Sequence, residues 1–178
     1  MKRNKHPLQD MIFASLMIAM GIVLPFLSGN NQELGSMLLL MHIPVILAGF
    51  LLGSYYGLLI GIITPILRSL LIGMPPLFPI ATSMMFELGA YGFFTGLFYH
   101  YLSNKKINIY LSLVLALILG RFVWGGAAFI FYPAAGLTFT FQTYLQAAFV
   151  TALPGIAIQL VLIPAIFFAL KRTQLVID

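Results

Sequence analysis

The sequence predicts an all-α integral membrane protein with six transmembrane helices and both termini in the cytoplasm. Of its 178 residues, 61% are hydrophobic and only 7% are charged, whereas charged residues make up about a quarter of a typical soluble domain. A spanning helix takes roughly 20 apolar residues, so six helices leave room only for short connections. We therefore expect a single membrane domain, residues 1–178, and no separate soluble domain.

Six apolar runs define the expected spans. The basic segment Met1–His6 precedes the first run, but five further runs and the lack of a small-residue cleavage site argue against a signal peptide. The most polar connection, Ser28–Ser36, contains no Lys or Arg and is expected to be an outer loop. The spans are expected at residues 8–27, 37–52, 58–72, 80–102, 109–131 and 141–170.

Glycine and proline mark the remaining connections. A tight turn is expected at Gly53–Gly57. Gly73–Pro79 contains three prolines, which remove backbone donors and clash with preceding carbonyls, so a stiff outer loop or re-entrant elbow is expected there. Tyr132–Thr138 is the third expected outer loop. The sixth run is long enough to require a tilt or a kink, for which Pro154–Gly155 is the candidate.

The distribution of basic residues predicts the orientation. With six spans, every Lys and Arg outside the spans falls on the side of the termini, and the positive-inside rule assigns that side to the cytoplasm. These residues lie at the ends of apolar runs and form no face of their own, so the net charge of +5 does not indicate nucleic-acid binding. The two other basic residues, Arg68 and Arg121, lie within spans.

Ionisable residues inside the apolar runs predict a polar chamber. Each costs about 2.5 to 3.5 kcal/mol on insertion scales and rarely faces lipid. At 1.5 Å per residue, His42, Arg68 and Glu87 are expected roughly 7 to 12 Å below the outer surface. Arg121 is expected roughly 15 Å below it. Nothing comparably polar continues into the inner half, so we expect an outward-facing cavity for a small polar molecule rather than a pore.

Further polar residues are expected in this layer. Ser83, Glu87 and Tyr91 form an i, i+4, i+8 stripe on one helix. Gln142 and Gln146 are one turn apart and are expected to enter the same layer. The first outer loop is expected to cover it like a lid, through Asn30, Asn31, Gln32 and Glu33.

The charges allow two interpretations. Arg68 and Glu87 could neutralise each other as a structural pair between helices. Arg121 would then lack an acidic partner in the membrane, since Asp10 lies at the cytoplasmic edge. A surplus guanidinium suits the carboxylate or phosphate of an anionic ligand, because its donors match those groups bidentately.

Three other candidates also have two interpretations. His42, two residues before Pro44, is either a hydrogen-bonded structural residue or a ligand contact. Trp124 and Tyr132 either stack on a ligand or anchor at the membrane interface.

Several kinds of chemistry have no motif in the chain. It contains no cysteine, which excludes disulfides, thiolate nucleophiles and sulfur-ligated metals. No phosphate-binding loop, H-E-x-x-H or G-x-S-x-G is present, so the chain is not expected to hydrolyse ATP or to be an enzyme. No cofactor, metal or catalytic residue is expected. In the first span, Ala14, Ser15 and Ala19 are small residues that permit close approach of another helix.

The whole chain resembles the substrate-binding S components of energy-coupling factor (ECF) vitamin transporters. The most specific stretches are MHIPVILAGFLLGSYYGLLIGIITPILRSLL, GMPPLFP and FELGAYGFFTGLFY, which look like the subgroup assigned to pantothenate uptake. The resemblance implies a multi-pass protein of the prokaryotic plasma membrane that captures a vitamin at an outward-facing site. It also implies a module of one coupling transmembrane protein and two ABC ATPases, and toppling within the lipid bilayer to release the vitamin inside.

The resemblance assigns roles to particular residues. Ala14, Ser15 and Ala19 would contact the coupling protein, although Ser15 departs from the family's alanine motif. The ligand contacts are a hypothesis from the residues themselves: if the ligand is pantothenate, Arg121, assisted by Arg68, would bind its carboxylate. The hydroxyls and the amide of pantothenate would bond to Asn31, Tyr91, Gln142 and Gln146.

Other ligands and classes remain open at this stage. A pyridoxine-type or hydroxymethylpyrimidine-type ligand would stack on Trp124 or Tyr132 and leave the arginines structural, while riboflavin suits so many charged groups less well. A stand-alone channel or secondary transporter needs a polar route across the whole membrane, and no inverted repeat is visible. A scaffold without a ligand would leave the polar layer unexplained.

Overall fold

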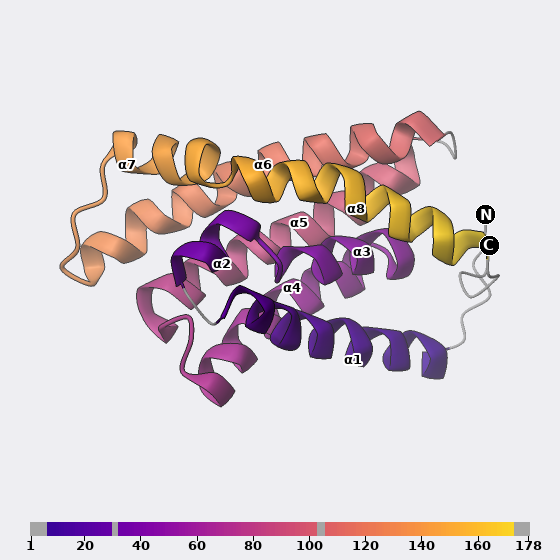
Figure 1. The fold of residues 1–178 in the computed structure, drawn as a ribbon, viewed down its shortest axis with the longest axis horizontal. Helices are drawn as coiled ribbons and strands as arrows, with labels where there is room; N and C mark the ends of the chain where they lie inside the picture. The colour runs from indigo at the N-terminus through magenta and orange to yellow at the C-terminus, as the bar shows by residue number, and fades with distance from the viewer. Residues whose placement is uncertain (1–6, 30–31, 103–105, 173–178) are drawn as a thin grey trace.

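The structure is a computed structural model that describes residues 7–29, 32–102 and 106–172, and the regular elements in these ranges are all helical (Figure 1). Five helical segments are long and apolar enough to cross a membrane, and a sixth apolar helix, His42–Leu52, is shorter. The elements are α1 (Pro7–Val23), η1 (Leu24–Ser28), α2 (Gln32–Leu38), α3 (His42–Leu52), α4 (Ser54–Ile72), η2 (Leu77–Ala81), α5 (Thr82–Tyr101), α6 (Lys106–Ala134), α7 (Phe141–Leu145), η3 (Gln146–Thr151) and α8 (Leu153–Arg172).

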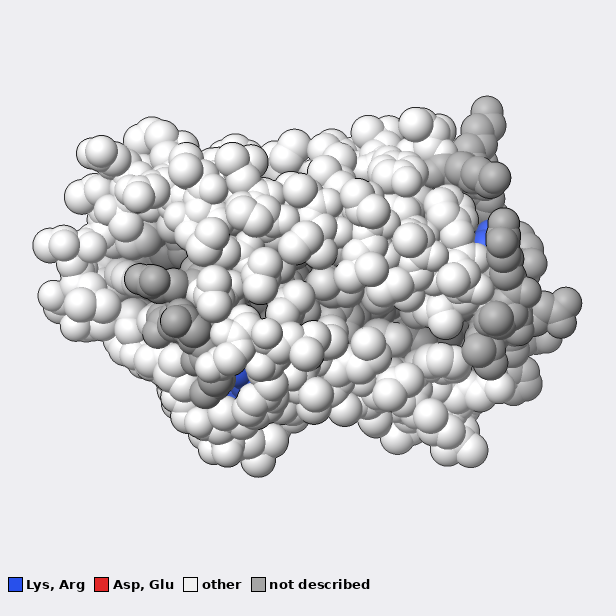
Figure 2. Space-filling model, in the orientation of Figure 1, with Lys and Arg blue, Asp and Glu red and all other residues white. Residues whose placement is uncertain are grey.

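The long helices lie side by side as one bundle. In Figure 1, α1 begins and α8 ends at the same end, while α2 and α7 lie at the other end. The face shown in Figure 2 is almost free of charged side chains among the described residues. Many large apolar side chains are exposed on α1, α6 and α8, among them Leu8, Ile130 and Val161. Such a surface is the one expected of helices in contact with lipid.

The centre of the bundle is α3, in which every residue except Leu51 is buried. Eleven residues at 1.5 Å of rise span about 16 Å, roughly half the hydrocarbon thickness. The predicted second span, 37–52, is therefore not one continuous helix. It is divided at Leu39, which has a positive φ of 53°, into α2 and α3.

Glycines bring α4 and α5 into backbone contact. A Cβ atom placed on Gly57 would collide with the carbonyl of Gly92, and one placed on Gly92 would collide with the carbonyl of Gly57. One turn along, Gly61 meets the carbonyl of Leu88 in the same way. In lipid, where helices gain little from the hydrophobic effect on association, such small-residue contacts permit close van der Waals packing.

Two predicted connections were wrong in extent. The turn expected over Gly53–Gly57 consists of Gly53 alone, with φ of 90°, and α4 begins at Ser54. Gly57 serves close packing instead of the turn. The outer loop expected from Tyr132 begins later, because α6 continues through Pro133 to Ala134.

Two other predictions agree with the structure in part: an irregular segment is present at the prolines, and the sixth run is broken, but at Ala152 and not at the expected Pro154–Gly155. Gly73–Pro76 is not helical, and η2, which follows, is kinked at Phe78 before α5 begins. The sixth apolar run is interrupted at Ala152, between η3 and α8. Pro154 therefore lies in the first turn of α8, where a missing N–H costs little.

Candidate ligand-binding site

A cavity of about 240 Å³ lies within the end of the bundle that carries α2 and η3. Its wall combines η1, α2 with the segment that follows it, the first residue of α3, α4 with the segment that follows it, η2, α5, α6 and η3. The side chains are mainly apolar, with a few polar groups. They include Ser28, Leu39, Met41, His42, Arg68, Met74, Met84, Glu87, Arg121, Trp124, Tyr132, Ala147 and Thr151.

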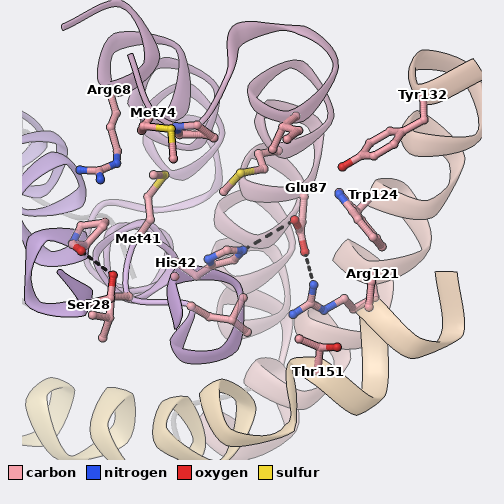
Figure 3. A pocket seen from close by; sticks show the side chains of 18 residues that line it. Ser28, Met41, His42, Arg68, Met74, Glu87, Arg121, Trp124, Tyr132 and Thr151 are labelled. Carbon is pink, nitrogen blue, oxygen red and sulfur yellow. Dashed lines mark hydrogen bonds and ion pairs between the residues drawn. The ribbon is translucent and has the colours of Figure 1, made fainter. Parts of the chain in front are cut away.

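Glu87 is the centre of a buried polar cluster at one end of this cavity (Figure 3). Arg121 donates from Nη1 to Oε1 of Glu87 at 2.7 Å. The hydroxyl of Tyr91 donates to the same oxygen at 3.0 Å. On the other side of the carboxylate, Nε2 of His42 lies 3.7 Å from Oε2. The cluster joins α3, α5 and α6. Of these helices, α5 packs against both of the other two.

Donors in this cluster are left over. Nε and Nη2 of Arg121 have no hydrogen-bond partner among the described residues, and neither does either ring nitrogen of His42. Both residues line the cavity and are almost completely buried. A buried polar group without a partner costs about 1 to 3 kcal/mol, so their presence beside a cavity indicates a site for a hydrogen-bonding ligand.

Arg68 lies apart from this cluster, toward the opposite end of the cavity (Figure 3). Its Nη1 donates to the carbonyl of Ile22 at 2.5 Å, and its guanidinium carbon lies 5.1 Å from the ring centroid of Phe26. Both contacts fix the arginine against the end of the first span. The cavity thus has one guanidinium toward each end.

The structural pair between Arg68 and Glu87, one of the two interpretations that the sequence left open, is not formed. Glu87 pairs with Arg121 and not with Arg68, so Arg121 is not the surplus cation that the sequence indicated. Depth along each helix placed all three residues in one layer, but it does not say which helices are neighbours. α6 packs against α5 along much of its length, whereas Arg68 on α4 meets the end of α1.

Aromatic and hydroxyl groups support the cluster. Tyr91 is fully buried behind Glu87 and does not line the cavity. Trp124 and Tyr132 both line it. Trp124 stacks on Tyr144 with ring centroids 6.1 Å apart, and the Tyr144 hydroxyl donates to the carbonyl of Arg121 at 3.4 Å. Aromatic packing therefore holds the part of α6 from which Arg121 and Trp124 project.

Gln142 and Gln146 were expected in the polar layer, but both are exposed and neither lines the cavity. After the five residues of α7 the helix widens into the π-type turn η3, which presents Ala147 and Thr151 to the cavity instead. Asn31 and Asn30 lie outside the described residues, as do the side chains of Gln32 and Glu33, so the expected lid stays a prediction.

Four further residues of the cavity wall were not predicted from the sequence. Met41, Met74 and Met84 all line the cavity, and so does Ser28, whose hydroxyl is already bonded to the Pro25 carbonyl at 2.6 Å. Methionines within apolar runs are typical of any membrane helix, so no signal in the sequence distinguishes these three.

The small residues of α1 lie toward its outer side. Ser15 and Ala19 are exposed, and Ala14 is half-buried. The Ser15 hydroxyl donates to the carbonyl of Met11 at 2.9 Å, so it is satisfied within its own helix. Among the described residues no partner element covers this face.

Comparison with known proteins gives one match. The family model described as "ECF transporter, substrate-specific component" matches residues 9–167. No curated protein and no solved structure matches the chain.

Across the ranges that the structure describes, no group of three or more His, Asp or Glu side chains is arranged to hold a metal ion.

Proposed function

The chain belongs to the family of ECF transporter substrate-specific components, and we propose that its cavity captures a small vitamin with a carboxylate, pantothenate being the first candidate. Members of this family are transport subunits of the cell membrane that bind substrate and are not enzymes, and they associate with the ECF energising module. The proposal therefore concerns which molecule is bound and how this chain binds it.

The observation that carries the proposal is the unpartnered edge of Arg121. Nη1 of its guanidinium is committed to Glu87, which leaves Nε and Nη2 as donors with no partner among the described residues. Adjacent guanidinium N–H groups match the two oxygens of a carboxylate. In a water-poor cavity such a charge-assisted pair is stronger than in bulk water. A carboxylate placed there would satisfy both donors at once.

The size of the cavity limits the ligand. Its volume of about 240 Å³ lies below the range of roughly 300 to 1,000 Å³ for sites of drug-sized ligands. A compact molecule suits this space, and the large ring system of riboflavin does not. Pantothenate is compact, with a carboxylate at one end and hydroxyls at the other.

The second guanidinium favours a ligand with polar groups at both ends. Arg68 lines the cavity away from the cluster around Glu87. The sequence alone indicated that both arginines bind one carboxylate, and this separation argues against that arrangement. We propose that Arg121 binds the carboxylate, and that Arg68 faces the hydroxyl end of the ligand. Nδ1 of His42, which has no hydrogen-bond partner among the described residues, is available to the central amide, while Nε2 faces Glu87.

A pyridoxine-type or hydroxymethylpyrimidine-type ligand is the second candidate. It is favoured by Trp124 and Tyr132, which both line the cavity and offer aromatic surface to a flat heterocycle. In that case a hydroxyl or ring nitrogen of the ligand would meet Arg121 or His42, and no carboxylate would be needed.

The proposal includes an orientation and a partner surface. We propose one membrane domain with both termini in the cytoplasm and the cavity facing outside, as the distribution of Lys and Arg predicts. We further propose that Ala14, Ser15 and Ala19 contact the coupling protein, that two ABC ATPases supply the energy, and that the protein topples to deliver the vitamin. The loop with Asn31 would cover the occupied cavity.

A binding panel tests the proposal. The purified chain in lipid nanodiscs should bind pantothenate in calorimetry, with pyridoxine, hydroxymethylpyrimidine and riboflavin as competitors. Arg121→Ala should abolish binding of the carboxylate ligand. Unchanged affinity in that variant, or binding of a heterocycle in preference to pantothenate, would overturn the assignment. Uptake into proteoliposomes that lack an ATPase module would instead favour a stand-alone transporter.

A further inference from the structure

The segment between α2 and α3 supplies three consecutive residues to the cavity wall, Leu39 to Met41, and His42, the first residue of α3, follows them in the wall. We call Leu39–Met41 the elbow. Leu39 adopts the left-handed conformation, with φ of 53°, and its N–H donates to the carbonyl of Gly35 at 3.0 Å, which ends α2. The residues that follow can then re-enter the bundle as α3.

The carbonyl of Leu39 accepts two hydrogen bonds. One comes from the backbone N–H of His42 at 3.0 Å, and the other from Nε2 of Gln159 on α8 at 3.4 Å. Gln159 lies 120 positions later in the chain and is fully buried. A side chain of α8 is therefore joined through one carbonyl oxygen to the backbone of His42, whose ring faces Glu87.

A second residue of α8, Gly155, contacts the end of α2 and the first residue of the elbow. A Cβ atom on Gly155 would collide with the carbonyl of Met37 and crowd that of Leu38. Gly155 and Gln159 are four positions apart, so they lie on one face of α8, and that face packs on the elbow. Neither residue lines the cavity.

The amide of Gln159 is only half used. Its Oε1 has no partner among the described residues, although the residue is completely buried. An apolar residue of similar size would avoid this cost if the position only filled space. A polar side chain at this position is explained if its Nε2 donor is needed, and Nε2 donates to the carbonyl of Leu39.

We propose that Gln159 and Gly155 are positioning residues for the binding site: from outside the cavity they fix the elbow and, through it, the place of the His42 ring beside Glu87. Gln159 donates the hydrogen bond to Leu39. Gly155, which has no side chain, lets α8 approach closely enough for this bond to form. The consequence for ligand affinity rests on the proposed function, whereas the positioning of His42 does not.

The experiment uses the three histidines of the chain. The full-length protein, labelled on histidine with ¹³C and ¹⁵N, is placed in lipid nanodiscs, and its ring signals are assigned with His6→Gln and His100→Gln variants. Gln159→Met, of similar length but without a donor, should shift the His42 signal and leave the other two in place. Gly155→Ala should shift the same signal, and it decides the matter if Gln159→Met does not fold.

Ser112→Ala is the matched control. Ser112 is also fully buried with an unpartnered oxygen, but it lies on α6. An unmoved His42 signal in Gln159→Met and Gly155→Ala, or an equal shift in Ser112→Ala, overturns the proposal even if thermal stability falls. No ligand is needed for this result, so it is independent of whether pantothenate binds. With pantothenate as the probe, Gln159→Met should also weaken binding several-fold.

Discussion

Arg121 and Glu87 form an ion pair of 2.7 Å in which both side chains are almost completely buried. The pair is neutral as a unit, so the cavity can contain a guanidinium within the membrane without an isolated charge. Because the carboxylate binds only one edge of the guanidinium, the other edge is held in place and stays available. The same contact thus joins α5 to α6 and fixes the orientation of the remaining Arg121 donors.

Removing one member of this pair should be costly. Glu87→Gln leaves the Arg121 charge buried without compensation, and breaking a buried pair in this way costs about 3 to 5 kcal/mol. We expect a clear fall in the melting temperature of the protein in nanodiscs. The double variant Glu87→Gln, Arg121→Gln should regain part of the loss, because no charge remains buried. If the loss in the double variant equals the sum of the losses in Glu87→Gln and Arg121→Gln, the two residues are not coupled.

A charge-conserving change should separate stability from binding. Arg121→Lys keeps a cation beside Glu87 but offers a point charge in place of adjacent parallel donors. We expect a modest change in melting temperature and a loss of carboxylate-ligand affinity of about 1.5 to 3 kcal/mol, which is roughly ten- to hundredfold. Calorimetry with pantothenate measures it. Full affinity in the lysine variant would mean that the unpartnered edge does not bind the ligand.

The residues that entered the site were predictable where membrane physics restricts them. An ionisable side chain inside an apolar run rarely faces lipid, so His42, Glu87 and Arg121 were expected to lie together inside the bundle. In the structure Glu87 contacts both His42 and Arg121. Arg68 was also expected at the cavity, and it lines it. The cost of burying charge thus selected the residues but not their partners.

What failed depended on geometry that no local pattern encodes. Gln142 and Gln146 have the spacing of one helical face, but both are exposed, and Ala147 and Thr151 of the π-type turn line the cavity instead. The elbow depends on a non-glycine residue, Leu39, in a left-handed conformation. Gln159 acts on that residue from another helix. These features are set by packing between segments distant in sequence.

The contact between α4 and α5 predicts a sharp difference between two glycines. Gly92→Ala places a methyl group against the carbonyl of Gly57, and overpacking of this kind costs about 1 to 3 kcal/mol. Gly126→Ala on α6 meets nothing within 4 Å and should be neutral or slightly stabilising. Thermal unfolding of the two variants in the same nanodiscs measures the difference. Equal melting temperatures would contradict the close packing.

The single tryptophan of the chain should report ligand binding. Trp124 lines the cavity and is 9% exposed, so a ligand that fills the space changes the polarity around its indole. We expect the emission of the protein to change in intensity or wavelength in a saturable way during titration with pantothenate. Trp124→Phe should remove the signal while calorimetry still detects binding. Binding in calorimetry without any change in emission would place the ligand elsewhere.

The small residues of α1 should matter for assembly and not for binding. Ala19→Leu adds bulk to an exposed position, where it neither fills the core nor reaches the cavity, so stability and vitamin affinity should stay near those of the parent protein. If the coupling protein packs closely on this face, the added side chain should strongly reduce co-purification with the ECF module. Val161→Phe, at a position on α8 that is 72% exposed, is the control for bulk on a lipid-facing surface. Undiminished co-purification of Ala19→Leu, or an equal loss in both variants, would show that this face of α1 is not the docking surface.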